Sequence, residues 1–397
     1  MKEHVNPPGS NKDDVERLVQ LANNLADLDE SVDDAAFESC FEYQALQSRV
    51  TVHLQSGHDT TLRQAVEAME PESEPYELLI DEIEVLSAIT VPIGDVADAT
   101  TSCLFVIPAI VSSIGGLTDG RLASSEQLAT FTSALQASGV MPADSTVCVA
   151  PYLYRHSELA ELVPCDIYGL SSSLLYQSGL TGADLFQRDW QRPELPDDMA
   201  DAAIHEMVYL LGVCASKETP PLLVPWEDDP HAHLEDSPDH PLEKWHESAF
   251  PSFCAMVDAK GVSTDILLLT PAIFYQGLRN AMGFYSDMAV MDQLQTKLAK
   301  ANVEPRGAVA TLNFVPVDRP PEGIQVQVWS RLDETLLAAD VRMFVRYEDP
   351  EQTMRILNHH LVHLGLAEVR LVGFSDDEDS RPSGSFATES PRGTRLH

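Results

Sequence analysis

Histidines and carboxylates, the side chains that most often bind divalent transition metals, gather in one segment of the chain, residues 217–242. The segment is rich in Pro, Asp and Glu and carries the histidines His231, His233 and His240. Imidazole nitrogens combined with carboxylate oxygens can bind zinc and similar ions. Their spacing matches no zinc motif, and loops rich in His and Asp are commonly only solvated. We therefore keep these three histidines as a candidate metal site beside the interpretation of a solvated insertion.

Two other segments have part of a metal-binding pattern. HHLVH places His359 and His363 one helical turn apart, which is compatible with metal binding, but it lacks the glutamate of HExxH and also suits an amphipathic packing helix. HEMVY at His205 begins like HExxH but has Tyr209 where the second histidine is needed. Neither segment predicts a metalloenzyme.

A possible ligand site follows the apolar run that ends at Pro271. The segment YQGLRNAMGFYS comes after a predicted strand, and ligands of open α/β sheets bind at strand ends. Arg279 could pair there with a carboxylate or a phosphate, although a surface arginine is the plainer interpretation. The candidate ligand-binding residues are Tyr275, Arg279, Asn280, Tyr285 and Trp226.

No catalytic residue can be named from motifs. The chain has no GxGxxG after a strand, no GxxxxGK[ST] and no GxSxG. GGLTDGR at 115–121 could form a backbone nest for an anion, but it also suits a plain loop. We therefore assign no catalytic residue and no cofactor, and we expect a binding protein rather than an enzyme.

The elements that must position these residues include a segment that occurs twice. CLFVIPAIV around Pro108 returns as ILLLTPAIF around Pro271, so that residues 102–142 match residues 265–305. Each copy begins with a short apolar run that fits a buried strand, at 103–107 or 266–269. Proline should end that strand because it has no amide hydrogen to donate to the sheet.

The rest of each copy predicts a helix and a second strand. Ser124 and Asp287 occupy matching positions and are good N-caps, and apolar residues at i, i+3 and i+7 form one helical face in both copies. Gly139 and Asn302 share the position where a left-handed residue closes a helix. The second strands are expected near 146–151 and 308–316. We infer an α/β fold of two related halves, with two unrelated βαβ units or an α+β fold as alternatives.

Composition limits the possible partners. The chain has 397 residues, 44% of them hydrophobic, and a formal net charge of −38. Such a charge repels nucleic acid and anionic membranes, so we expect no direct nucleic-acid or membrane binding. The six cysteines form no CxxC pair, which favours buried free thiols. With no signal peptide and no apolar run of transmembrane length, we expect a cytoplasmic protein.

The expected organisation has an N-terminal helical region before the two halves. Its parts are a disordered N-terminus 1–12, the helical region 13–75, a first half 76–182, a connection 183–200, a second half 201–374 that contains the insertion 217–242, and a disordered acidic tail 375–397. Helices are expected at 13–29, 33–48, from Asp59, at 198–207 and at 350–364, and strands near 85–92, 207–215, 324–330, 336–346 and 368–373.

Taken together, these features resemble the bacterial domain-of-unknown-function family 2863, which is mainly β-proteobacterial. The likeness covers roughly 13–372. It rests on DVERLVQLANNLADL, CLFVIPAIV, MVYLLGVCA followed by Trp226, Trp245, and ILLLTPAIFYQGLRNAMGFYS. This chain is more acidic than expected of the family, and its insertion 217–242 is divergent. The resemblance implies architecture and a cytoplasmic setting but no catalytic residue.

Our leading hypothesis is a non-enzymatic binding or scaffold protein that binds a protein partner or associates with itself. A small-molecule enzyme or ligand sensor with a site near 275–286 is the first alternative, and it requires Tyr275, Arg279, Asn280 and Trp226 to converge in one pocket. An acidic decoy for a basic nucleic-acid-binding protein is the second alternative, and it requires carboxylates spaced like phosphates along one face.

Overall fold

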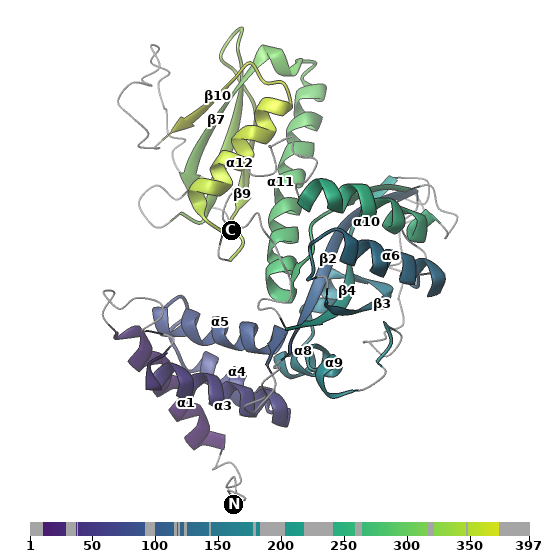
Figure 1. Cartoon of the computed structure of the whole chain (residues 1–397). Coiled ribbons are helices and arrows are strands. Elements are labelled where there is room, and N and C mark those ends of the chain that lie inside the picture. The colour runs from purple at the N-terminus through teal and green to yellow at the C-terminus, as the bar shows by residue number, and fades with distance from the viewer. Residues whose placement is uncertain are drawn as a thin grey trace, which may run out of the picture. The chain divides into compact units, whose positions relative to one another are not determined.

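The computed structural model describes most of the chain, which divides into two compact units (Figure 1). The units are Met1–Ala281 and Met282–His397, and both mix helices with strands, which confirms the α/β class. The described residues are 11–28, 37, 39–91, 100–114, 117, 120–122, 125–142, 144–177, 180–182, 203–217, 241–258, 264–315, 321–346 and 348–372.

Four helices in the described residues precede the first sheet. They are α1 (Asn11–Ala26), α3 (Phe41–Ser56), α4 (Asp59–Glu67) and α5 (Glu74–Ala88). They share an apolar core that includes Leu18, Leu46 and Leu79. The predicted strand at 85–92 is wrong over most of its length, because α5 continues through Ala88 and only the short strand β1 (Ile89–Thr90) follows.

The sheet of the first unit is built on two long antiparallel strands, β2 (Thr101–Ile114) and β4 (Ala203–Ser216). The strand order is β1-β2-β4-β3, with β3 (Thr146–Arg155) beside β4. Two short strands, β5 (Thr264–Leu268) and β6 (Ala272–Ile273), also pair with β2. The predicted helix at 198–207 is wrong where it is described, because residues 203–207 belong to β4.

Helices cover both faces of this sheet. Phe105 and Ile107 of β2 share a core with Phe131 of α6 (Ser125–Ala137) and with Trp245 of α10 (Pro241–Asp258). The alternate residues of β2 pack on the opposite side against α7 (His156–Ala160), α8 (Pro164–Ser171), α9 (Ser173–Tyr176) and the start of α11 (Phe274–Lys300). β2 is therefore buried on both faces, as its continuous apolar run predicts.

Pro108 does not end β2, contrary to the prediction. The strand continues to Ile114 because β5 pairs with residues 109–113 and β6 pairs with residues 105–106, which leaves a break between them beside Pro108. The Pro108 carbonyl accepts a hydrogen bond from Leu269 N at 2.9 Å on this side. The missing amide hydrogen of Pro108 points to the same side, so it falls where neither short strand pairs with β2.

The two matched segments take different paths, so the structure does not support the internal duplication. The first leads from β2 through the 13-residue α6 to β3 of the same sheet, whereas the second leads from β5 through the 27-residue α11 to a different sheet. Asp287 is not an N-cap, since it lies buried within α11. The left-handed conformations of Gly139 (φ 80°) and Asn302 (φ 54°) are confirmed.

The boundary between the units also differs from the predicted one. The predicted halves 76–182 and 201–374 would place β4 apart from β2 and β3, but β4 lies between these two strands in one sheet. The division of the described structure falls instead within α11, after Ala281.

The second unit contains one four-stranded sheet and two helices. Its strands are β7 (Ala308–Val315), β8 (Gly323–Ser330), β9 (Leu336–Met343) and β10 (Glu368–Val372), in the order β10-β7-β8-β9. β10 is parallel to β7 and the other pairs are antiparallel. These strands and the helix α12 (Pro350–His363) confirm the elements that the sequence predicts between 308 and 373.

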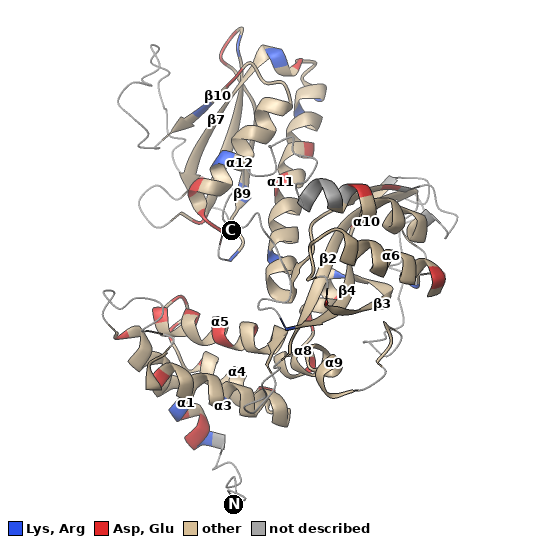
Figure 2. Cartoon of the chain, viewed as in Figure 1, with Lys and Arg blue, Asp and Glu red and all other residues tan. Residues whose placement is uncertain are grey.

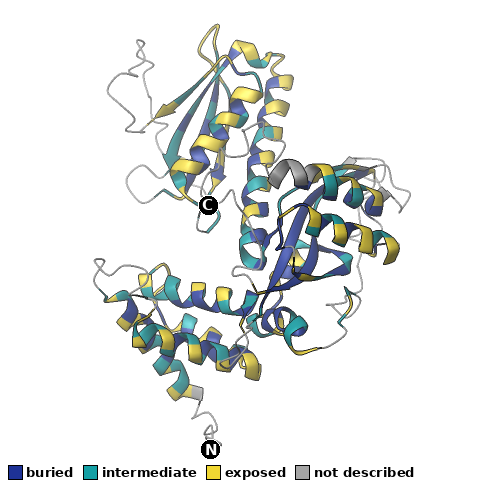
Figure 3. Ribbon diagram, viewed as in Figure 1, coloured by how far each residue is buried: buried dark blue, intermediate teal, exposed yellow. Residues whose placement is uncertain are grey.

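One face of this second sheet is covered by helices. The even-numbered residues of β7 and β8, such as Leu312 and Val326, are buried against Leu294 of α11 and Leu357 of α12, whereas the residues between them are partly exposed (Figure 3). This alternation is the period-two pattern of a half-covered antiparallel sheet. The face formed by the odd-numbered residues is called the open face below.

Candidate functional site

Two of the predicted ligand-binding residues, Tyr275 and Arg279, lie in the first two turns of α11. Arg279 forms an ion pair with Glu84 of α5 through its Nη1. Burial raises the pKa of the Tyr275 phenol, although a hydrogen bond with Ser87 acts in the opposite direction. The charge of Arg279 is thus already paired within the protein, which favours a structural role for this residue.

The other predicted site residues do not join them. Asn280 is exposed on α11, and Tyr285 lies further along that helix in the second unit. Trp226 and the predicted metal ligands His231, His233 and His240 lie outside the described residues, as do the connection 183–200 and the tail 375–397. The structure therefore brings together only Tyr275 and Arg279 of this set.

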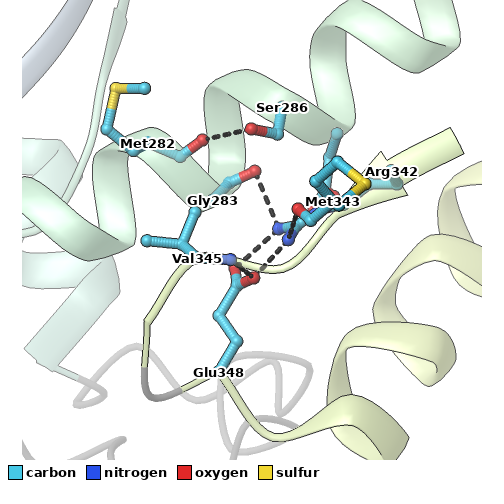
Figure 4. Close-up of polar contacts among 8 residues, drawn as sticks. Met282, Gly283, Ser286, Arg342, Met343, Val345 and Glu348 are labelled. Atoms are coloured by element: carbon cyan, nitrogen blue, oxygen red, sulfur yellow. Dashed lines mark hydrogen bonds and ion pairs between the residues drawn. The ribbon is translucent and has the colours of Figure 1, made fainter. Parts of the chain in front are cut away.

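A buried ionic cluster in the second unit was not predicted. The side chain of Arg342 on β9 is 1% exposed and donates from Nε to Asp287 of α11 at 2.7 Å. Its Nη2 donates to Glu348 Oε1 at 2.6 Å and to the Gly283 carbonyl at 3.0 Å. Its Nη1 donates to the other oxygen of Glu348 and, at 2.9 Å, to the Met343 carbonyl (Figure 4).

All five donors of Arg342 are therefore used within the protein, so this guanidinium cannot serve a ligand without losing a bond. Burial raises the pKa of Asp287 against the opposing effect of Arg342. Burial also disfavours the charge of Arg342, but its bonds to Glu348 and the charge of Asp287 outweigh this, and its pKa is raised. The cluster ties α11, β9 and the segment before α12 together.

Gly283 fits this cluster because it has no side chain. A Cβ at this position would overlap the Glu348 carboxylate and would lie 3.2 Å from Arg342 Nη2. The sequence signal for the cluster is weak, because the residues that form it are far apart in the chain and the matched copies single out only Asp287 among them.

A second polar cluster lies where β3 and β4 pair in the first unit. The Nδ1 of His156 is 3.1 Å from the hydroxyl of the buried Tyr209. Burial lowers the pKa of His156 and raises that of Tyr209. Arg155 pairs with Glu206 at 3.3 Å. Sequence reasoning missed His156, since no motif contains it.

The comparison with protein families matches residues 4–318 to the family described as "Protein of unknown function (DUF2863)". The chain belongs to this family. The DUF2863 match confirms the resemblance drawn from the sequence, and the family description assigns no activity. Neither the curated proteins nor the solved structures contain a match to the chain.

The part of this DUF2863 protein that the structure describes has no large cluster of metal-ligating side chains. Within it, no group of three or more His, Cys, Asp or Glu side chains could hold an ion. The six cysteines are free, but only Cys103 and Cys214 are buried as predicted, and the other four are partly buried. No described helix is long and apolar enough to cross a membrane.

The open face of the second sheet is a feature of this DUF2863 protein that suits binding. Apolar side chains line its β9 edge, where Leu336, Val341 and Met343 are exposed, and Val372 is exposed at the opposite edge, on β10. Polar pairs occupy its centre, where Asn313 donates to Gln325 at 3.0 Å and the Trp329 indole donates to Thr311 at 3.4 Å. On the same face, opposite Val309 and Thr311 of β7, Arg370 of β10 donates from Nε to Glu368 at 2.7 Å. The face is thus apolar along β9, polar in the middle and charged at β10, where the two charges are paired with each other.

Proposed function

We propose that this DUF2863 protein is a non-enzymatic binding protein and that the open face of its second sheet binds a second copy of the chain. The observation that carries the proposal is the open face itself. Large apolar side chains exposed together on one surface are typical of interaction sites. The polar residues at the centre of the face are amides and hydroxyls, which can pair across a symmetric interface without burying charge. The charges of Glu368 and Arg370 at its β10 edge are paired with each other.

The distribution of charge favours a second copy as the occupant. Residues 282–372 contain 12 acidic and 9 basic residues, whereas residues 1–281 contain 46 acidic and 13 basic residues. Both signs are interspersed in the second unit (Figure 2). Because like charges repel, two copies of such an acidic chain would associate best through their least charged part. A basic partner would instead be attracted to residues 1–281.

The size of the open face predicts a weak, concentration-dependent dimer. Three eight-residue strands about 25 Å long and the shorter five-residue β10, spaced about 4.8 Å apart, present roughly 450 Å². A standard interface buries about 800 Å² on each partner. The open face therefore supplies more than half of a standard interface, and we expect a dissociation constant in the micromolar range.

Pairing through the β9 edge of the sheet is less favourable than pairing through the face. The edge strand β9 carries the inward-pointing Arg342 and Asp340, and its register with β8 shifts near Trp329. Inward charges and bulges are devices that protect edge strands from pairing with other chains. This supports the face, rather than the β9 edge, as the contact.

The other two hypotheses have less support. A ligand site near 275–286 would need Arg279, whose charge Glu84 already neutralises. An acidic decoy would need carboxylates in a regular row, and it stays a prediction that nothing among the described residues tests.

Sedimentation equilibrium of the full chain, at several protein concentrations and at low and high salt, tests the proposal. We expect a monomer–dimer equilibrium that shifts towards the dimer at high salt, because salt screens the repulsion between the acidic first units. Met343→Asp on the open face should weaken the dimer at least about tenfold, since symmetry places like charges near each other.

The matched control is Val362→Asp on α12, because Val362 and Met343 are both 53% exposed and only Met343 lies on β9. The control should dimerise like the unchanged protein. A strict monomer at all concentrations, or equal weakening by both substitutions, would overturn the proposal.

A further inference from the structure

Two histidines near the C-terminal end of α12 have the geometry of a metal chelate. His359 and His363 are both exposed, lie one helical turn apart and have ring centroids separated by 4.1 Å. An ion bound to both imidazoles at about 2.1 Å would hold the ring centres roughly 4.5–5 Å apart. Small rotations of the two side chains are therefore enough to form the chelate.

One of the two rings is already oriented as metal-binding histidines are. The Nδ1 of His363 is 3.0 Å from the carbonyl oxygen of His359. A carbonyl can only accept, so Nδ1 carries the proton, and the neutral ring keeps its lone pair on Nε2. Histidines that bind metals almost always donate their second ring N–H to a carbonyl, carboxylate or water in this way.

The charges near the pair also suit a cation. Both histidines lie in the last turns of α12, where the carbonyl ends of the helix favour positive charge. Arg355, one turn before His359, has its charge paired with Glu351 at 3.9 Å. The net charge of −38 raises the concentration of cations around the whole protein.

His360 differs from its two neighbours and does not belong to the chelate. It is partly buried, burial lowers its pKa, and it interacts electrostatically with Asp287 of α11. Its ring centroid is 6.5 Å from that of His359. It therefore serves as an internal control on the same helix.

We propose that His359 and His363 together bind one divalent late first-row transition-metal ion. Imidazole suits Cu²⁺, Ni²⁺ and Zn²⁺, and at a given nitrogen site Cu²⁺ binds more tightly than the other two. Two protein ligands leave the remaining coordination positions to water or to a ligand from another molecule. The site is independent of the open face and of the proposed dimer.

Histidine modification by diethyl pyrocarbonate, read by mass spectrometry, tests this site in the full chain. Trypsin releases the peptide 356–370, which contains all three histidines of α12. CuCl₂, NiCl₂ or ZnCl₂ should protect His359 and His363 together, with Cu²⁺ acting at the lowest concentration. The reactivity of His360 should change much less.

Variants separate this chelate from other histidines. Losing either ligand, in His359→Ala or His363→Ala, should raise the metal concentration that gives half-protection of the remaining one by at least about tenfold. His58→Ala, which removes an exposed histidine elsewhere, should have no effect. Replacing His231, His233 and His240 together should leave protection on α12 unchanged.

A relocated pair keeps the test informative if removing His363 weakens α12. Arg355→His combined with His363→Ala restores a pair one turn apart, at positions 355 and 359, and should restore joint protection. Protection that persists in His359→Ala, or no joint protection at any metal concentration that leaves the protein folded, would overturn the proposal.

Discussion

Replacing Gly283 by alanine should destabilise the second unit, although the same change within most helices stabilises. Alanine is favoured over glycine in a helix interior by about 1 kcal/mol. At position 283, however, the added Cβ would overlap the carboxylate of Glu348. Arg342 is 1% exposed and belongs to β9, so Glu348 is the group that must move.

The displacement breaks the two charge-assisted hydrogen bonds between Glu348 and Arg342. Such bonds contribute about 1.5–3 kcal/mol each. Glu348 is 20% exposed, so hydration of its carboxylate recovers part of the free energy lost with these bonds. After the gain in helix propensity is subtracted, Gly283→Ala should lower the free energy of unfolding of the second unit by about 1–3 kcal/mol.

Hydrogen exchange of peptides from β7, β8 and β9, measured as a function of urea, reports the unfolding of the second unit by itself. The matched control is Gly169→Ala in α8, where a Cβ would meet nothing within 4 Å. That change should stabilise the first unit by up to about 1 kcal/mol. In a Glu348→Ala background, Gly283→Ala should be neutral or stabilising. Stabilisation by Gly283→Ala alone would refute the reasoning.

Three further predictions follow from the first unit. Burial lowers the pKa of His53, which is 4% exposed, below its ordinary value of 6.5, so the unfolded chain binds the proton more readily. The protection factors of amides in α1 and α3, which are corrected for the intrinsic pH dependence of exchange, should therefore fall as pH falls below about 6.5, and His53→Gln should remove this fall. Glu84→Gln and Arg279→Gln should each lower the free energy of unfolding, measured in urea, by about 1 kcal/mol. The two losses should not add in the double variant, and additive losses would contradict the ion pair. Burial raises the pKa of Cys103 and, to about 11, that of Cys214, so both thiols should resist iodoacetamide at pH 8 until urea unfolds the first unit.

Elements with a clear hydrophobic period could be predicted from the sequence. β8, β9, α12 and β10 were placed because short-range patterns decide them, and Gly139 and Asn302 were identified because few residues favour the left-handed conformation. α5 was missed because the apolar residues at its end also suit a strand. These successes and errors all depend on neighbours within a few residues.

The polar clusters could not be predicted, because their partners are distant in the chain. Arg342 and Asp287 are 55 residues apart, and Arg279 and Glu84 are 195 residues apart. Rules based on neighbouring residues predict Asp287 as an N-cap and Arg279 as a ligand-binding residue. Tertiary pairing gives both residues a different role.

The break between β5 and β6 has a consequence for how the first sheet assembles. Among the residues of β2 whose backbone faces β5 and β6, Pro108 is the one without an amide hydrogen to donate. If β5 or β6 paired with β2 in a register shifted by two residues, its side chains would stay on the same faces of the sheet. A carbonyl of the shifted strand would then lie opposite Pro108, which has no amide hydrogen to donate to it. Pro108 thus selects against shifted registers during folding. We expect Pro108→Val to fold with more mispaired intermediates, even if its native state is equally stable.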